Sequence, residues 1–210
     1  MWPWEHVVVG YVAYSLWARL RYGESPGGAE ALAVGGGSLL PDLIDKPLAW
    51  EFGVFETGYA LGHSIFFAVP LAIAAGLAGR AIGRPPVGVA FAVGYLLHLP
   101  ADVLDSYVRG GRVQVEIICW PVCEPATAGT ERGFRDQTMV LVGGYVNDLL
   151  AGSPSTYLLV QFGLAVLAVS LWVTDGAPPV GGLFGRRRDD TNESLNESDQ
   201  DEKQPVENEQ

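Results

Sequence analysis

The sequence predicts an all-α protein: a multi-pass membrane bundle of about five transmembrane helices, followed by a disordered acidic tail. Charged residues are concentrated at the C-terminus, since residues 186–210 hold nine of the 24 acidic and four of the 13 basic side chains. The rest of the chain is poor in charge compared with a soluble domain, in which roughly 25% of residues are charged. Its apolar residues lie in long runs, which is typical of membrane-spanning helices.

Five apolar segments are candidates for these helices, each of which needs roughly 20 mostly apolar residues. They comprise residues 6–20, 29–44, 58–79, 87–104 and 156–173. The third and fifth are the most apolar, whereas the first is short and aromatic. The second contains three consecutive glycines, which close helix packing tolerates in a membrane. No basic stretch precedes the first segment and no cleavage site follows it, so we expect a retained anchor.

The remaining chain predicts less regular structure. Residues 138–150 are too short to span comfortably and predict an interfacial helix. We place the transmembrane domain at residues 1–175 and a disordered acidic tail at residues 176–210, because the last 25 residues are polar and free of aromatic side chains. Cys119 and Cys123 are too few for a disulfide framework, and we expect two buried thiols or one disulfide.

Arginine clusters predict the orientation, because basic residues accumulate on the cytoplasmic side of membrane proteins. Such clusters follow the first, third and fifth segments, which end on the same side of the membrane. They comprise Arg19, Arg21, Arg80, Arg84, Arg186, Arg187 and Arg188. We therefore expect a multi-pass protein of the cell membrane with its N-terminus outside and its tail in the cytoplasm. The net charge of −11 and the lack of a basic face exclude nucleic acid and leave the lipid bilayer as the partner.

Ionisable side chains inside apolar segments are costly and mark a functional site. Here they lie at the start of the first segment, the end of the second, the start of the third and the end of the fourth. Because the chain crosses the membrane between them, all four positions lie at one end of the bundle. The residues are Glu5, His6, Asp42, Asp45, His63, His98, Asp102 and Asp105.

The spacing of these residues predicts a metal site. His98 and Asp102 are four residues apart and Asp42 and Asp45 are three apart, so each pair shares a helix face. Imidazole and carboxylate are ligands that zinc, manganese and iron accept, and the helices of a bundle can direct them to one or two ions. We expect a divalent metal ion, with zinc or manganese the best candidates.

Single members of this set also have structural interpretations. The second segment can end in a turn at Pro41 and Asp42, with Asp45 paired to Lys46. The histidine of the first segment can be an interfacial residue, and the last acid of the fourth can be a solvated boundary residue. The histidine and aspartate of the fourth segment are harder to explain in this way, because both would lie at membrane depth.

The order of these residues resembles the family of membrane-bound metal-dependent hydrolases, which is compared with zinc-dependent phospholipases C. The matching residues, within about residues 1–125, are His6, Leu40-Pro41-Asp42 with Asp45, Gly62-His63-Ser64, Gly94-Tyr95 with His98 and Asp102, and Trp120-Pro121. The resemblance implies metal binding by His6, Asp42, His63, His98 and Asp102, with Asp45 as a further candidate. Glu5, where such proteins often have Thr, and the absence of a basic residue just before His63 depart from the family pattern.

These observations together predict metal-assisted hydrolysis near the extracytoplasmic face. The ion would polarise the scissile group and generate the nucleophile, with Asp45 or Asp102 as the proton acceptor if that residue is not itself a ligand. A site at the depth of lipid headgroups suggests a phosphoester or an acyl ester of a lipid as substrate. Two alternatives are an ion-coupled transporter, whose ionisable groups lie near the middle of the bilayer, and a haem-binding membrane protein without hydrolase activity.

Overall fold

The computed structural model describes residues 1–123, 132–150 and 156–180. Within these ranges the chain forms six α-helices and one short 3₁₀ helix and no strand, which confirms the all-α class. The elements are α1 (Pro3–Tyr22), α2 (Gly28–Trp50), α3 (Ile65–Ala81), α4 (Pro85–Gly110), η1 (Val115–Ile118), α5 (Phe134–Leu150) and α6 (Thr156–Thr174).

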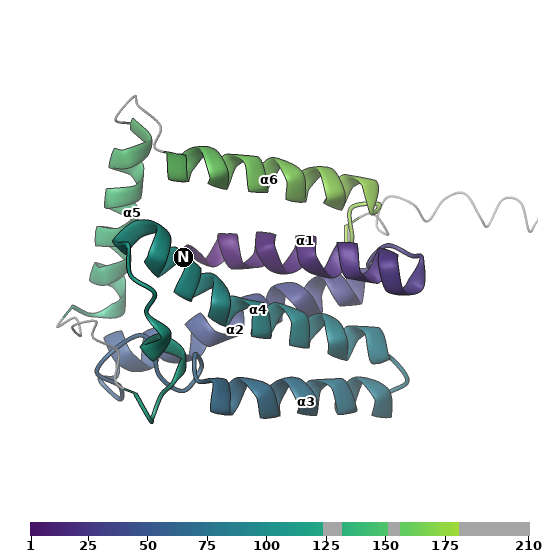
Figure 1. The fold of residues 1–210 in the computed structure, drawn as a ribbon, viewed down its shortest axis with the longest axis horizontal. Coiled ribbons are helices and arrows are strands. Elements are labelled where there is room, and N and C mark those ends of the chain that lie inside the picture. Colours follow the sequence, from purple (N-terminus) through teal and green to yellow (C-terminus); the bar gives the residue numbers. More distant parts are fainter. Residues whose placement is uncertain (124–131, 151–155, 181–210) are drawn as a thin grey trace, which may run out of the picture.

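Helices α1 to α4 form a bundle in which α4 contacts the other three, and α6 lies along the outside of α1. Figure 1 shows that α5 has a different direction, because it runs across the ends of the other helices beside the N-terminus. This is the segment for which the sequence predicts an interfacial helix. It begins four residues earlier than predicted and has no buried residue. The end of the bundle where α1, α3 and α6 begin is therefore the end that α5 crosses.

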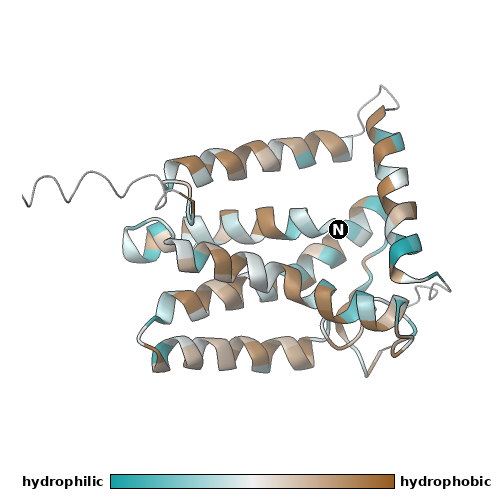
Figure 2. Ribbon diagram, turned by 180° about the vertical axis from the view of Figure 1, so that it is seen from behind, coloured by the Kyte–Doolittle hydropathy of each residue, from teal (hydrophilic) through white to brown (hydrophobic). Residues whose placement is uncertain are grey.

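Two of the described helices, α4 and α6, are long and apolar enough to cross a membrane. Helix α3 is also apolar but has only 17 residues. The two candidate spans are fewer than the predicted five, because ionisable and glycine residues in α1 and α2 lower the mean hydropathy of those two helices. Figure 2 shows the predominantly apolar colour of α3 and α6. Only 11% of the apolar window of α6 is buried inside the protein, which leaves that helix free to contact lipid.

Glycines allow α2 and α4 to approach each other closely. A Cβ atom at Gly37 would clash with the backbone carbonyl of Phe91, and one at Gly94 would clash with the carbonyl of Val34. Small residues permit such backbone contact between membrane helices. Next to this contact, the buried side chains of Val34 and Tyr14 belong to a core shared by α1, α2 and α4.

The ends of three helices differ from the predicted ones. Helix α2 continues through Pro41 and Pro47 to Trp50, so the predicted turn at Pro41 is wrong. A proline removes one helical hydrogen bond, but Pro41 is buried and α2 goes on packing beyond it. Helix α4 continues to Gly110, where the positive φ of Gly111 ends it. Helix α3 begins only at Ile65, so His63 lies in the loop before it.

At the end of the bundle opposite α5, α6 is joined to α1 by a buried carboxylate. Asp175 accepts hydrogen bonds from the hydroxyls of Tyr11 (2.7 Å) and Ser15 (2.8 Å) and from Nε of Arg19 (3.1 Å). Because Asp175 directly follows α6, these contacts hold the C-terminal end of that helix against α1.

The cysteines and the start of the predicted tail are also described. Cys119 and Cys123 are free thiols of intermediate exposure, so the structure shows neither a disulfide nor full burial. Trp172 Nε1 donates a hydrogen bond to the carbonyl of Pro178 (2.6 Å), which folds the chain after residue 175 back onto α6. The rest of the predicted tail, residues 181–210, lies outside the described residues.

Candidate metal centre

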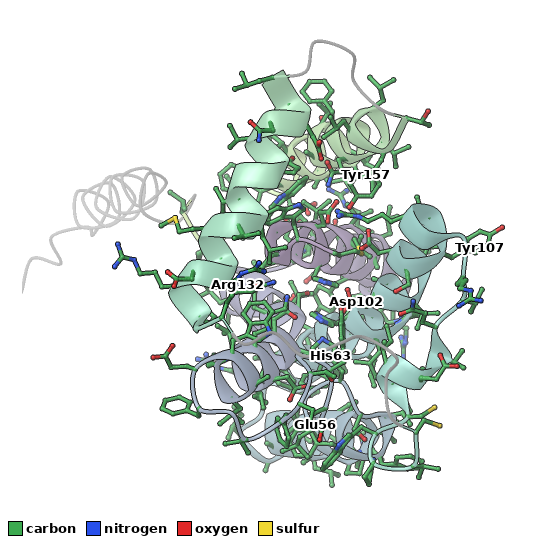
Figure 3. The ribbon with its side chains drawn as sticks, turned by 90° about the vertical axis from the view of Figure 1, so that its left-hand side faces the viewer. Glu56, His63, Asp102, Tyr107, Arg132 and Tyr157 are labelled. Atoms are coloured by element: carbon green, nitrogen blue, oxygen red, sulfur yellow. The ribbon has the colours of Figure 1, made fainter. Side chains whose placement is uncertain are left out.

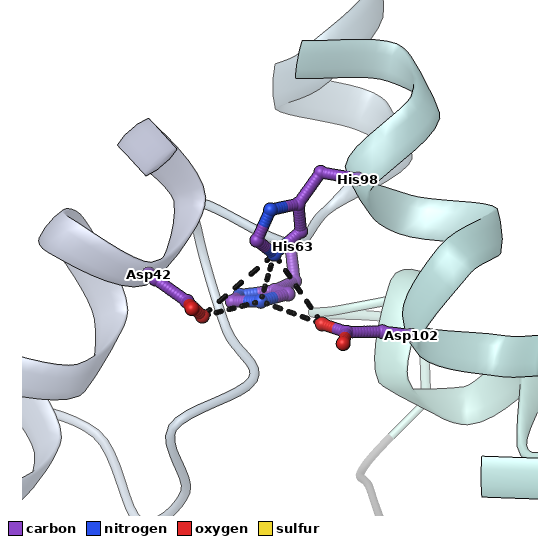
Figure 4. A group of neighbouring side chains, drawn as sticks. All are labelled: Asp42, His63, His98 and Asp102. Atoms are coloured by element: carbon purple, nitrogen blue, oxygen red, sulfur yellow. Dashed lines mark hydrogen bonds and ion pairs between the residues drawn. The ribbon is translucent and has the colours of Figure 1, made fainter. Parts of the chain in front are cut away.

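Four buried side chains converge near the end of the bundle that α5 crosses. Asp42 comes from α2, His63 from the loop before α3, and His98 and Asp102 from successive turns of α4. One ligand atom of each side chain lies within 4.8 Å of the ligand atoms of the other three. Figure 4 shows the two imidazoles and the two carboxylates directed at a common centre.

Five of the six distances between these atoms are close to those of a tetrahedral metal site, and all six are within 4.8 Å. The Nε2 atoms of His63 and His98 are 3.1 Å apart. Oδ2 of Asp102 lies 3.3 Å from each of them, and Oδ1 of Asp42 lies 3.4 Å from His63 Nε2 and 3.7 Å from His98 Nε2. A tetrahedral zinc ion with bonds of about 2.0–2.2 Å separates its ligand atoms by roughly 3.3–3.6 Å. One small cation therefore fits between the four side chains.

Both imidazoles have their other ring nitrogen engaged by an acceptor. Nδ1 of His98 lies 2.7 Å from the carbonyl oxygen of Ser38, and Nδ1 of His63 lies 2.8 Å from Oδ2 of Asp45. A carbonyl and an ionised carboxylate only accept, so each Nδ1 carries the proton. With each ring neutral, the two Nε2 atoms would present lone pairs to the centre that they share with the two carboxylates. Neutral imidazoles and carboxylates are zinc ligands, and acceptors at the other ring nitrogens typically orient such imidazoles.

Asp45 holds the loop that carries His63. Its Oδ2 accepts hydrogen bonds from the backbone amides of Ala60 (2.8 Å) and His63 (3.0 Å), and its Oδ1 accepts one from Gly62 (2.8 Å). With the His63 ring, four donors use this one carboxylate, which is fully buried. Asp45 therefore orients His63 and does not face the common centre.

The same loop is held from two further sides. The hydroxyl of Tyr95 donates to the carbonyl of Gly62 (2.7 Å), and the hydroxyl of Ser64 donates to the carbonyl of Trp120 (2.6 Å). Tyr59 packs edge-on against the His63 ring, with 4.9 Å between ring centroids. The short motifs at Gly62, Tyr95 and Trp120 that were noted in the sequence thus meet around His63.

His6 lies beside the four-residue cluster. Its ring stacks on that of His98 with 3.6 Å between centroids, and its Nε2 lies 3.2 Å from Oδ1 of Asp102. The amino nitrogen of Met1 lies 2.8 Å from the same oxygen. Among the described residues, His6 Nδ1 is buried without a hydrogen-bond partner, and Nε2 has the contact with Asp102. Asp102 therefore presents Oδ2 to the cluster and Oδ1 to His6.

Lys46 places a positive charge next to one of the acids. Its Nζ lies 2.6 Å from Oδ2 of Asp42, at the i,i+4 spacing of an uninterrupted helix. The interpretation that paired Lys46 with Asp45 is wrong. Because α2 continues as a helix through Pro41, Lys46 lies one turn after Asp42 on the same helix face, whereas the adjacent residue Asp45 lies on a different face. Oδ1 of Asp42 is left facing the histidines.

The structure thus brings together four of the five predicted ligands, Asp42, His63, His98 and Asp102. The fifth, His6, contacts Asp102 without joining the four-atom group. Glu5 and Asp105 lie apart from the cluster and share a partner, because the hydroxyl of Tyr157 lies 2.9 Å from Glu5 and 3.0 Å from Asp105. No sequence pattern points to the Ser38 carbonyl, whereas an unbroken α2 would have indicated the contact between Lys46 and Asp42.

Comparison with known proteins identifies a family but no activity. Neither the curated proteins nor the solved structures contain a match to this chain. One family model, described as the YdjM inner membrane protein, matches residues 1–177 and thus covers every described helix. That description gives a location, so the resemblance to metal-dependent hydrolases stays a prediction. The match extends over most of the sequence, and the chain therefore belongs to the YdjM inner membrane protein family.

Proposed function

We propose that this protein is a membrane-embedded, metal-dependent hydrolase that acts on an ester or phosphoester of a lipid. The proposal depends on one observation, which is the buried set of four ligand atoms within 4.8 Å of one another, with both imidazoles oriented by second contacts. Zinc and manganese both accept imidazole and carboxylate ligands, and the spacing suits zinc best. When bound, such an ion polarises an ester group and makes a water molecule a better nucleophile.

The residues around the centre have separate tasks in this proposal. Asp42, His63, His98 and Asp102 hold the ion. Asp102 is also the proton acceptor, because its Oδ1 faces His6 at 3.2 Å while its Oδ2 faces the centre. Asp45, whose oxygens are already used by four donors, is a positioning residue and not the alternative proton acceptor that we predicted from the sequence.

His6 extends this arrangement in one of two ways. A proton accepted at Asp102 can pass to the nearby Nε2 of His6, because the two atoms are within 3.2 Å. His6 acts as a ligand, as the sequence resemblance implies, only with a second ion between its ring and Oδ1 of Asp102. The bridging position of a carboxylate between two ions is common in helical bundles.

The membrane position is proposed on the same grounds. The protein belongs to an inner membrane family. The cluster lies where α1 and α3 begin, because His6 in the first turn of α1 stacks on His98 and His63 lies just before α3. We propose that this end faces outward, with the N-terminus outside, several membrane crossings and the tail in the cytoplasm. A site at this depth meets the headgroup region, where the ester and phosphoester bonds of lipids lie.

The haem alternative does not fit the site. The two imidazoles that could bind iron have their Nε2 atoms 3.1 Å apart and their rings in contact, so no porphyrin fits between them. The cluster is a compact cation site instead. An ion-coupled transporter would place these groups near the middle of the bilayer, whereas here they lie at the end of the bundle.

Elemental analysis of the full chain, purified in detergent, tests the metal site. We expect one zinc or manganese ion per chain in the wild type and its loss in His63→Ala and His98→Ala. Asp102→Asn is compared with the control variant Asp105→Asn. Both acids lie on the same face of α4, but only Asp102 reaches the centre. A wild-type protein without stoichiometric metal, or His98→Ala with its full metal content, would contradict the proposal. Cleavage of an ester-linked lipid by the wild type and not by His98→Ala would support the activity.

A further inference from the structure

A cavity of about 830 Å³ lies between α5 and the end of the bundle. This volume is in the range of pockets that bind small organic ligands. Its walls include Lys46, which contacts the metal-site residue Asp42, and Tyr59, which packs on His63. The cavity is therefore separated from the proposed metal centre by single side chains.

Helix α5 gives the cavity one wall and turns its apolar side outward. Most residues of α5 that line the cavity recur every three or four positions and therefore form one face. They are Phe134, Gln137, Thr138, Leu141, Gly144, Tyr145 and Asp148, and Val140 lines the cavity from beside this face. The exposed apolar side chains Met139, Val142, Val146 and Leu149 lie between them and point away from the cavity. An outward apolar face with polar groups inside is the arrangement expected of a helix in contact with lipid.

Two aromatic pairs hold α5 in place across the cavity. Trp2 lies 4.9 Å from Tyr145 and Trp50 lies 5.9 Å from Phe134, measured between ring centroids. Figure 3, viewed toward this end of the molecule, shows α5 beside the labelled His63 and Asp102. Polar and apolar side chains thus line the cavity on both sides, and Phe134, Leu141 and Tyr145 form its apolar wall on α5.

The lining includes the side-chain cations of Lys46 and Arg109 together with the acids Asp105 and Asp148. Lys46 lies next to the metal site, and Arg109 lies on α4 with its side chain 47% exposed. Arg109 donates to Asp105 through Nε (3.0 Å) and to the hydroxyl of Tyr157 through Nη2 (2.6 Å), and its guanidinium lies 4.4 Å from the centroid of the Tyr157 ring. These contacts orient the guanidinium at the cavity wall. An oriented guanidinium is the group that best recognises a phosphate or a carboxylate.

We propose that this cavity binds a phosphate-bearing lipid, with the phosphate held by Arg109 and Lys46 and the acyl part against α5. A phosphate is favoured over a carboxylate because its oxygens point in several directions and offer acceptors to more than one of the cations in the lining. The proposal rests on the proposed hydrolase function only for the fate of the bound lipid, which the nearby metal centre would cleave. Arg109 then determines specificity without contacting the metal.

Calorimetric titration of the detergent-purified full chain with dioctanoyl phosphatidic acid tests this binding. Dioctanoylglycerol lacks the phosphate, inorganic phosphate lacks the acyl chains, and octanoate carries a carboxylate on one acyl chain without the glycerol. We expect each of these three to bind at least about tenfold more weakly than the phosphatidic acid. Equal binding of dioctanoylglycerol, of octanoate or of inorganic phosphate would overturn the proposal, and the last result would point to a site for free phosphate.

Arg109→Gln should weaken binding of the phosphatidic acid by about tenfold or more, because it removes a charged hydrogen-bond donor. Arg84→Gln is its control, since Arg84 is exposed at the other end of α4. If Arg109→Gln does not fold, Leu141→Gln on the cavity face of α5 should weaken binding and Val142→Gln on the outward face should not. Unchanged affinity in both cavity variants would overturn the proposal.

Metal content distinguishes this proposal from the function on which it rests. Arg109→Gln should keep the metal content of the wild type, because Arg109 contacts none of the four ligands. A protein that binds phosphatidic acid through Arg109 but holds no metal would contradict the hydrolase and support the lipid site. A protein that holds metal but binds phosphatidic acid no better than dioctanoylglycerol would contradict the lipid site alone.

Discussion

Replacing Asp45 by asparagine tests whether a residue outside the ligand set controls the metal site. The carboxylate accepts three bonds at Oδ2 and one at Oδ1. In its best orientation, the asparagine side chain keeps an oxygen at the position of Oδ2. Its NH₂ group then takes the position of Oδ1 and faces the backbone amide of Gly62, so two hydrogen-bond donors face each other. One bond is lost and three change from charged to neutral, which costs about 4 kcal/mol of stability. The His63 ring also loses the charge that strengthens it as a ligand, which typically costs 10–100-fold in metal affinity.

Two measurements on the detergent-purified Asp45→Asn variant check these values. Tryptophan fluorescence during heating should show a lower unfolding temperature, and competition with a chelating indicator should show weaker zinc binding by at least about tenfold. Asp136→Asn, in the exposed first turn of α5, is the matched control and should change neither value. An Asp45→Asn protein that unfolds like the wild type and binds zinc within twofold of it would refute the role of Asp45.

Three further perturbations have separate outcomes. Gly62→Ala would place a Cβ atom 2.7 Å from the carbonyl of Pro41, so we expect a loss of about 1–3 kcal/mol in thermal unfolding together with weaker zinc binding. Asp175→Asn weakens the ion pair with Arg19, whose side chain is 40% exposed. We expect a loss of about 1–2 kcal/mol in the free energy of unfolding. The metal content should stay normal, because Asp175 lies at the end of the bundle opposite the metal site. Removal of the metal by a chelator should lower the unfolding temperature reversibly, since free zinc at 1,000 times Kd stabilises the folded state by about 4 kcal/mol. The unfolding temperature of His98→Ala should not change on chelation.

The fold class and the approximate position of each helix follow from the sequence, but helix ends do not. The apolar runs locate all of the long helices, because apolar character persists over many residues. Ends depend on local competition between a proline and the packing of the whole helix. Pro41 would end an isolated helix, yet contact with α4 carries α2 on to Trp50. That contact joins residues far apart in the sequence and leaves no local pattern.

The members of the site were predictable to a similar degree. His98 and Asp102 stand out as ionisable residues one turn apart in an apolar helix, and the alternation of helix directions brings Asp42 and His63 to the same end. The division of tasks was not predictable, since Asp42 and Asp45 are chemically identical in the sequence. Only the path of the loop after α2 decides that Asp45 meets three amides and the His63 Nδ1 while Asp42 faces the centre.

The close contact between α2 and α4 explains why the ligands meet at all. Gly94 lies one turn before His98, and Ser38 lies one turn before Asp42. Where the backbones touch at Gly94, the next turn of α4 is near enough for His98 Nδ1 to reach the Ser38 carbonyl at 2.7 Å. This bond fixes the ring so that Nε2 faces Asp42 and Asp102.

The helix contact and the metal site should therefore be lost together. In Gly94→Ala, the new Cβ would meet the carbonyl of Val34 and force the two helices apart. We expect it to cost about 1–3 kcal/mol in thermal unfolding and to weaken zinc binding as well, because His98 would no longer reach Ser38. Gly143→Ala on α5 is the control, since nothing lies within 4 Å of a Cβ there. Zinc binding that is equal in the two variants would show that the site forms without the glycine contact.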